Sequence, residues 1–424
     1  MKSLEAVLNE IDGSTDDIIS TMIGMIRYPA LAPVNGGVGE GEKADYLQSK
    51  LTGFDSVMRI DVPDETDPSV MRPNILARKE GKRKGTLWIV SHIDVVPAGD
   101  PAEWDTPPFE GVLKDGSIYG RGTEDNGQSV ISSMFASRPF LGEELEGMSI
   151  GIAYVADEET TSKMGIEYLL DHDYFTKDDV IMVPDWGSRD GSNIEVAEKS
   201  MLWLRFTIEG KTTHGSTPEF GINAYKVSTL LLMDLMESFH EAFASDFIRR
   251  VELNAAIQAK DEDPSFVGRT STFEPTKRPA TVENVNTIPG YDEFCMDIRL
   301  LPRYPIDDVI AMAKDIAASY ERSTGAKIGI EIIERHDAGR PSSTDNEAFQ
   351  ALADSIGSVL GKRPVGVGIG GGTCANFFRQ KGLDAYVWQY GGGTLHAPNE
   401  HVPVENILID AKVYATLIHR LCLQ

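Results

Sequence analysis

Short apolar runs alternate with helix-like stretches between residues 14 and 196 of the chain. The run from Thr86 to Val90 is typical of a buried strand. Apolar residues at helical spacing mark four other stretches: Asp16 to Ile26, Lys43 to Leu51, Ser129 to Leu141 and Lys163 to Leu170. Such an alternation predicts a mostly parallel α/β sheet.

The pattern changes after residue 197. It then predicts the strand MLWLRFTIEG, a helix from Gly221 to Phe243, the strands STFEPTK and DEFCMDIRLLP, a helix from Ile306 to Ser323, and the strand AKIGIEIIE. The order β-α-β-β-α-β is that of a ferredoxin-like unit. We therefore expect an inserted domain over residues 198–338, with the larger domain formed by residues 1–197 and 339–424.

Residues that carry chemistry stand where apolar runs end. They are His92 and Asp94 after the run Thr86 to Val90, Asp125 at the start of a helix-like stretch, Glu158 and Glu159 after another run, Asp185, and His396 in a Gly-rich loop. In open α/β sheets, binding sites form outside the carboxyl ends of the strands. The sequence therefore predicts that these residues share one site.

Imidazole and carboxylate groups without a thiolate suit zinc, cobalt or manganese. A carboxylate two residues after a histidine can also orient the imidazole from its far side. Each residue has a simpler explanation: Glu158 and Glu159 as a solvated pair at a helix start, Asp125 and Asp185 as helix N-caps. One site that holds two divalent metal ions, most simply zinc, accounts for all of them together.

Composition narrows the class of protein. The chain has 424 residues, of which 41% are apolar and 25% charged, enough for two or three domains with cores of their own. Its formal net charge of -26 argues against nucleic acid and anionic membranes as partners.

Neither a secretory signal nor a long apolar stretch occurs in the sequence. Only three cysteines are present, Cys295, Cys374 and Cys422, which do not form a disulfide framework. A Gly-rich binding loop explains Cys374 better than a nucleophilic role. We therefore expect a cytoplasmic protein.

Six motifs occur in the order HIDVVP, WDTPPF, DGSIYGRGTED, DEET, THGSTP and TLHAPNE. In this order they resemble one metallopeptidase family, over about residues 15–415. The family includes acetylornithine deacetylase, succinyl-diaminopimelate desuccinylase, aminoacylase, glutamate carboxypeptidase, and di- and tripeptidases. The resemblance implies a mostly parallel-sheet zinc-hydrolase catalytic domain with an inserted lid and dimerisation domain.

The resemblance also implies roles for the residues of the site. It assigns His92, Asp125 and Asp185 to one metal ion, and Asp125, Glu159 and His396 to the other, with Asp125 as the bridge. Glu158 becomes the general base that takes a proton from the water shared by the metals. Asp94 becomes the partner that orients His92.

Further residues are implied to contact the substrate. In relatives, the histidine that corresponds to His214 stabilises the oxyanion in the partner subunit's site, which implies a homodimer. By this resemblance, Asn286 and Arg299 match positions that face the substrate, and the segment Gly370 to Thr373, including Gly372 and Thr373, would supply backbone N–H groups to the same end. Arg suits a carboxylate because it binds it in bidentate fashion. Arg299 could instead pair with a neighbouring acid, and His214 could be an ordinary loop residue.

The choice of substrate stays open between two branches of the family. Asp185 stands where deacylases usually have Glu and di- and tripeptidases Asp, which favours a peptidase. The compact insertion favours the deacylases, and we expect hydrolysis of a small N-acylated amino acid, with a di- or tripeptidase as the alternative. An inactive scaffold protein is a remote third alternative, because suitable residues occupy every metal-ligand and base position. Asn126, Gly127 and Gln128 replace a methionine-lysine-glycine run common in relatives, so the function of that lysine is absent or relocated.

Overall fold

The computed structural model describes residues 2–243, 270–279 and 284–423. The chain divides into two compact units. Unit 1 comprises Met1–Val196, Ser342–Val367 and Thr373–Gln424, and unit 2 comprises Ala197–Pro341 and Gly368–Gly372. Within the described ranges, no helix is both long and apolar enough to cross a membrane.

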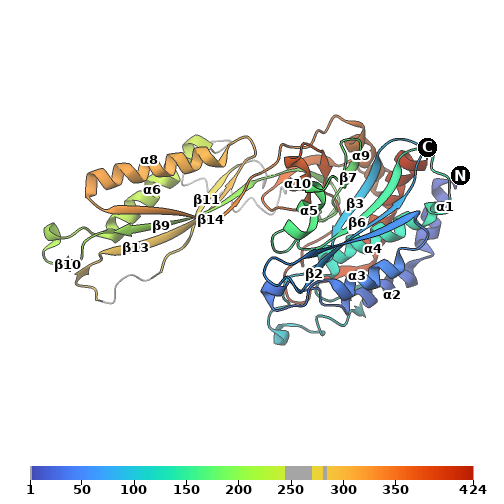
Figure 1. The fold of residues 1–424 in the computed structure, drawn as a ribbon, viewed down its shortest axis with the longest axis horizontal. Coiled ribbons are helices and arrows are strands. Elements are labelled where there is room, and N and C mark those ends of the chain that lie inside the picture. The colour runs from blue at the N-terminus through green and yellow to red at the C-terminus, as the bar shows by residue number, and fades with distance from the viewer. Residues whose placement is uncertain (1, 244–269, 280–283, 424) are drawn as a thin grey trace. The chain divides into compact units, whose positions relative to one another are not determined.

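Unit 1 is built on a six-stranded sheet with the order β1-β2-β6-β3-β7-β16 (Figure 1). The strands are β1 (Ser56–Pro63), β2 (Met71–Lys79), β3 (Thr86–His92), β6 (Ser149–Val155), β7 (Val180–Met182) and β16 (Ala385–Tyr386). Strand β3 pairs in parallel with β6 and β7, β7 pairs in parallel with β16, and only the pairings of β2 with β1 and β6 are antiparallel. The predicted mostly parallel α/β sheet is confirmed.

Helices cover both faces of this sheet, which explains the continuous apolar runs of its central strands. The helices are α1 (Leu4–Asp12), α2 (Thr15–Ile26), α3 (Gly41–Lys50), α4 (Gln128–Ser137), α5 (Tyr168–Asp171), α9 (Glu347–Leu360), α10 (Cys374–Gln380) and α11 (Val404–Ile418). In β3, Leu87 and Ile89 belong to the core that includes α9 and α11, whereas Trp88 and Val90 belong to the core that includes α5 and α10. Every residue of β3 is therefore buried.

Smaller sheets accompany the main sheet. Strands β17 (His401–Pro403), β5 (Ser117–Tyr119) and β4 (Val112–Lys114) form one three-stranded sheet. Strand β8 (Asn193–Glu198) pairs with β15 (Val365–Ile369).

Unit 2 contains a four-stranded antiparallel sheet with the order β11-β13-β9-β14. Its strands are β9 (Ser200–Glu209), β11 (Thr272–Lys277), β13 (Tyr291–Leu300) and β14 (Lys327–His336), and its helices are α6 (Ala224–Phe243) and α8 (Ile306–Thr324). Alternate residues of β9 pack in one core with both helices because side chains along a strand point to opposite faces in turn. The described elements follow the β-α-β-β-α-β order. Unit 2 also contains a short antiparallel pair of strands, β10 (Thr213–His214) and β12 (Thr287–Ile288).

One predicted helix is wrong in its extent. The stretch from Lys163 to Leu170 is split into an irregular turn, Lys163–Glu167, and the short helix α5. The break lies at Gly165, whose backbone angles are not helical. A Cβ atom at this position would lie 1.9 Å from the carbonyl oxygen of Ala156, so only glycine permits this approach of two backbone segments.

Replacement of Gly165 by alanine is expected to destabilise unit 1 by about 1–3 kcal/mol, because the backbone must shift to accommodate the methyl group. Urea unfolding followed by circular dichroism measures the effect. Gly142→Ala is the matched control, since a Cβ atom there meets nothing within 4 Å. Equal unfolding midpoints for the two variants would contradict this account of Gly165.

Candidate metal centre

Three neighbouring strands carry acidic and imidazole side chains to one edge of the main sheet. His92 is the last residue of β3, Glu158 and Glu159 follow β6, and Asp185 follows β7. Strand β3 lies between β6 and β7 and is parallel to both, so the three carboxyl ends meet at the same edge.

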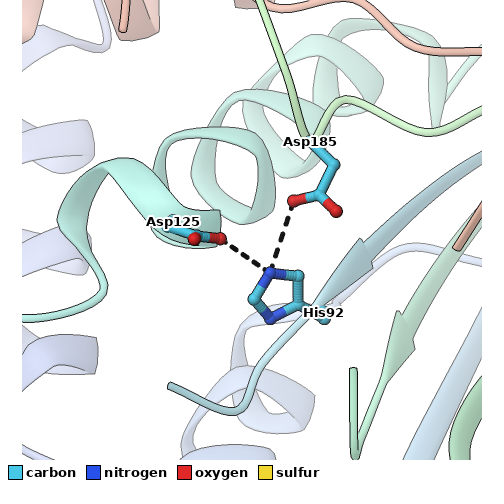
Figure 2. Close-up of side chains that lie close together, drawn as sticks. All are labelled: His92, Asp125 and Asp185. Atoms are coloured by element: carbon cyan, nitrogen blue, oxygen red, sulfur yellow. Dashed lines mark hydrogen bonds and ion pairs between the residues drawn. The ribbon is translucent and has the colours of Figure 1, made fainter. Parts of the chain in front are cut away.

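Asp125 joins two groups of potential ligands. His92 Nε2 lies 2.8 Å from Asp125 Oδ1 and 3.3 Å from Asp185 Oδ1 (Figure 2). His396 Nε2 lies 3.0 Å from Asp125 Oδ2 and 3.1 Å from Glu159 Oε2. In each group, one ligand atom per residue lies within 4.8 Å of the others. The two oxygens of Asp125 thus face different groups, as a bridging carboxylate requires.

Asp94 holds three members of the site. Its carbonyl oxygen lies 3.1 Å and its carboxylate Oδ1 3.4 Å from His92 Nδ1, on the side of the imidazole that faces away from Asp125. The same carboxylate accepts hydrogen bonds from the backbone N–H groups of Glu158, at 3.1 Å, and Glu159, at 3.0 Å. Asp94 therefore orients the imidazole of His92 and fixes the start of the loop that carries both glutamates.

Burial raises the pKa of the Glu158 carboxyl well above its usual range, and the charge of Asp185 adds to this effect. Burial also raises the pKa of Glu159 to about 7, although a hydrogen bond with His396 opposes the shift. Glu158 lies in neither ligand group and its nearest imidazole nitrogen, His92 Nε2, is 4.0 Å away. A carboxylate of raised pKa that is not needed as a ligand suits a general base.

The pKa values of the two imidazoles, His92 and His396, are raised as well, but by their acidic neighbours and not by burial. Burial alone would lower the pKa of His92, but Asp185 and Asp125 raise it well above its usual range. Hydrogen bonds with Asp125 and Glu159 raise the pKa of His396 to about 10. A proton on either imidazole would thus lie between that imidazole and these carboxylates. The donor set of carboxylate oxygens and imidazole nitrogens fits divalent zinc, cobalt or manganese in place of those protons.

Asn126 and Lys43 lie beside the ligands, and sequence reasoning missed both roles. Asn126 Nδ2 donates to Asp185 Oδ1 at 2.5 Å and to the carbonyl of Pro184 at 2.9 Å, so it orients a ligand. Lys43, from α3, lines one small space with His92, Asp94, Asn126 and Gly127. Burial lowers the pKa of Lys43 to about 8. Lys43 thus lines the same small space as Gly127.

The other predicted site residues lie mainly in unit 2. His214 is exposed, and its Nδ1 lies 2.8 Å from Ser216 Oγ. Asn286 is its neighbour, because the Asn286 carbonyl accepts from Gly215 N–H at 2.6 Å. The ligand groups belong to unit 1, so the structure of each unit alone does not bring these residues together with the ligands.

Arg299 and its surroundings form a second charged cluster. Arg299 donates to both carboxylate oxygens of Asp297, at 2.8 and 3.1 Å, and to the Gly370 carbonyl at 3.4 Å. Arg299 is therefore paired with a neighbouring acid, Asp297. Lys199 is buried next to this arginine: burial lowers the pKa of Lys199 to about 8, and the Arg299 charge adds to the shift.

The Gly-rich segment has mixed roles. Gly372 belongs to unit 2 with Arg299, whereas Thr373 belongs to unit 1. Thr373 is the N-cap of α10, and its hydroxyl accepts from Ala375 N–H at 3.1 Å. Cys374 follows and is buried. Burial raises the pKa of its thiol well above its usual range, which agrees with the prediction that it is not a nucleophile.

Comparisons with known proteins agree on one family. The family model described as peptidase family M20/M25/M40 matches residues 88–420. A protein of Methanocaldococcus jannaschii described as an uncharacterized metallohydrolase is 36% identical over 424 residues, covering 95% of this chain and 99% of its own. A succinyl-diaminopimelate desuccinylase of Gluconacetobacter diazotrophicus is 27% identical, covering 94% and 95%. The solved structure of a di-peptidase of Saccharomyces cerevisiae shares the fold, with a TM-score of 0.72, 19% identity and 98% of each chain covered.

The metal-free protein is expected to take up two Zn²⁺ ions per chain, with an affinity that increases with pH up to about pH 10, the pKa of His396. Below its pKa of about 7, the Glu159 carboxyl holds a proton that a metal ion must displace. Competition against a chromophoric chelator at several pH values measures this dependence. Asp125→Asn is expected to weaken both ions, and an affinity that does not change with pH would contradict the assignment of Glu159 and His396 as ligands.

Proposed function

This chain belongs to peptidase family M20/M25/M40 and is a metal-dependent amidohydrolase, and we propose that it removes the acyl group from a small N-acylated amino acid. The observation that carries the proposal is the position of Asp125 between two ligand groups, one with His92 and one with His396. Acetylornithine deacetylase and succinyl-diaminopimelate desuccinylase are the activities to which we compare it.

In the proposed centre, His92, Asp125 and Asp185 hold one ion, and Asp125, Glu159 and His396 hold the other. When bound, the two ions would supply Lewis acidity to the amide carbonyl and to the attacking water. We take zinc as the resident metal, with cobalt or manganese as substitutes, because the donors are nitrogen and oxygen alone.

Glu158 carries the proton in the proposed reaction. Its carboxylate accepts the proton of the attacking water as the water oxygen forms a bond to the amide carbon. It then donates this proton to the leaving nitrogen when the amide C–N bond breaks. Burial of Glu158 and the nearby charge of Asp185 support this role, because both bring the pKa of the carboxyl closer to that of the groups with which it exchanges the proton.

The protein is proposed to act as a homodimer in the cytoplasm. By the family resemblance, His214 serves the active site of a partner subunit, where an imidazole N–H stabilises the oxyanion. The exposure of His214 and the hydrogen bonds that fix its Nδ1 side support this role. Unit 2 would then act as the lid and the dimerisation domain.

A free carboxylate of the substrate is the proposed ligand of the second charged cluster. Arg299 presents its guanidinium beside Asp297, and Lys199 adds a second cation in the same region. Asn286 and the backbone of Gly372 and Thr373 complete the proposed substrate contacts. Since Asp297 compensates the charge of Arg299, Lys199 leaves this cluster with a net positive charge, which favours a substrate carboxylate over a neutral group.

A di- or tripeptidase is the second candidate. Asp185 supports it, because Asp at this position is usual in the peptidases of the family, and the fold is shared with a di-peptidase. An inactive scaffold agrees less well with a chain whose ligand and base positions are all filled.

Release of amine from N-acetyl and N-succinyl amino acids, measured beside a set of dipeptides, separates these candidates. The metal-loaded protein is expected to hydrolyse acylated substrates, and a chelator is expected to abolish the activity. Turnover of dipeptides alone would establish the peptidase instead.

The matched control in this assay is Glu158→Gln. It is expected to lower kcat about 10²–10⁴-fold while it binds both metal ions like the unaltered protein. Normal turnover by this variant would remove Glu158 from the role of base, and inactivity of the metal-loaded protein on every substrate would contradict the proposed function.

The Michaelis constant for carboxylate substrates is expected to increase above about pH 8, because Lys199 loses its positive charge as pH rises through its pKa of about 8. Lys199→Met is expected to increase KM by about tenfold at pH 7 and to lack this pH step. Substrates with an amide in place of the carboxylate serve as the control. An equal effect of the substitution on both kinds of substrate would exclude a carboxylate contact.

A further inference from the structure

Two buried glutamates that are not ligands connect the loops that carry Asp125 and His396. Glu124 directly precedes Asp125 and is only 3% exposed. Its Oε1 accepts a hydrogen bond from Gly393 N–H at 2.7 Å, and its Oε2 accepts from Thr394 N–H at 2.8 Å and from the Thr394 hydroxyl. The Glu124 carboxylate thus binds the His396 loop two residues before the imidazole.

Glu400 makes the reverse connection. It follows His396 by four residues and is fully buried. Its Oε1 accepts from the backbone N–H groups of Glu124, at 2.9 Å, and Asp125, at 3.0 Å. Its Oε2 accepts from Gly122 N–H at 3.0 Å and from Arg121 Nη1 at 2.6 Å. Each loop therefore supplies a carboxylate that binds the backbone of the other.

The His396 loop needs such a connection. Gly391, Gly392 and Gly393 have φ angles of 86°, 118° and 134°, which residues with a side chain rarely adopt. Three glycines in succession also have many other accessible conformations, so contacts from outside the segment must select this one. His396 itself has a φ of 60°, which is unfavourable for a residue with a side chain and persists only where the surroundings impose it. The His396 side chain is half exposed, so packing does little to fix it.

Charge makes these contacts strong. A carboxylate that accepts from backbone N–H groups forms shorter and stronger hydrogen bonds than a neutral acceptor does. Removal of one acceptor would leave a buried N–H group without a partner, which is costly. The contacts of Thr394 and Glu400 lie on either side of His396 in sequence, so a shift of this loop moves the imidazole directly.

We propose that Glu124 and Glu400 are positioning residues of the metal centre, Glu124 acting on the His396 group alone and Glu400, through Asp125, on both groups. The proposal rests on the metal centre of the proposed function but not on any substrate. If the two glutamates acted only through their negative charge, each would attract both ions equally. The proposal instead assigns them different effects on the two ions.

Titration of the metal-free protein with Co²⁺ tests this proposal through the visible absorption of the bound ion. Asp185→Asn and His396→Ala, each of which keeps one group intact, supply the reference spectra for the two positions. In Glu124→Gln, the ion of the His396 group is expected to bind about 10–100-fold more weakly, while the ion of the His92 group binds within about twofold of its original affinity. In Glu400→Gln, both ions are expected to weaken.

Two further variants make the test independent of folding defects. Thr394→Val removes the hydroxyl donor to Glu124, together with the hydrogen bonds of that hydroxyl to the backbone of His401, and leaves the two backbone N–H donors to Glu124 in place. It is expected to weaken the same ion by a smaller factor. Glu405→Gln alters an exposed glutamate in the first turn of α11 and is expected to change neither ion. If Glu400→Gln does not fold, Glu124→Gln and Thr394→Val still decide the outcome.

Equal weakening of both ions in Glu124→Gln would overturn the proposal in favour of a simple charge effect. Unchanged affinities together with a lower melting temperature would overturn it in favour of a purely structural role. These results are separate from the fate of the proposed function. A protein that binds two ions but hydrolyses none of the substrates fails as a deacylase and leaves the positioning roles intact.

Discussion

One carboxylate between two imidazoles is the constraint on which this structure depends. Asp125 lies 2.8 Å from His92 Nε2 and 3.0 Å from His396 Nε2, although these histidines are separated by the whole of unit 2 in sequence. The parallel sheet brings β3, β6 and β7 into register so that His92 and the acidic loops share one edge. The chain must then return to unit 1 after residue 341 to deliver the last imidazole.

This concentration of acids requires compensation in the interior, since a buried charge without a partner is destabilising. Arg72 is almost fully buried and binds Glu40 in bidentate fashion, with Asp64 at 2.8 Å and Asp157, at the start of the Glu158 loop, at 3.3 Å. Lys43 adds a second buried cation near Asp94. These cations do not neutralise the ligands themselves. In the proposed centre, the remaining negative charge at the edge of the sheet favours the binding of divalent cations.

Sequence reasoning could predict the sheet and the cluster of ligands because both follow local rules: apolar runs of strand length, and polar residues at their ends. Helix α2 begins within one residue of its prediction for the same reason. Glu124 and Glu400 gave no local signal, because their partners lie about 270 residues away and backbone N–H groups leave no trace in a sequence. Lys43 gave a weak signal, as a charged residue on the same helical face as the apolar Leu47. The break at Gly165 depends on Ala156 in another segment and could not be read from helical periodicity.

The connection between the loops also bears on how the protein is made. His396 follows Glu159, its partner in the second group, by 237 residues, and Glu400 lies later still. A ribosome adds about 5–20 residues per second, so many seconds pass between synthesis of the acidic edge of the sheet and synthesis of the residues that complete it. During that interval the edge holds at most one complete ligand group, that of His92, Asp125 and Asp185. In the proposed centre, the two positions are therefore unequal in time as well as in structure, because the second is complete only after the His396 loop has been translated.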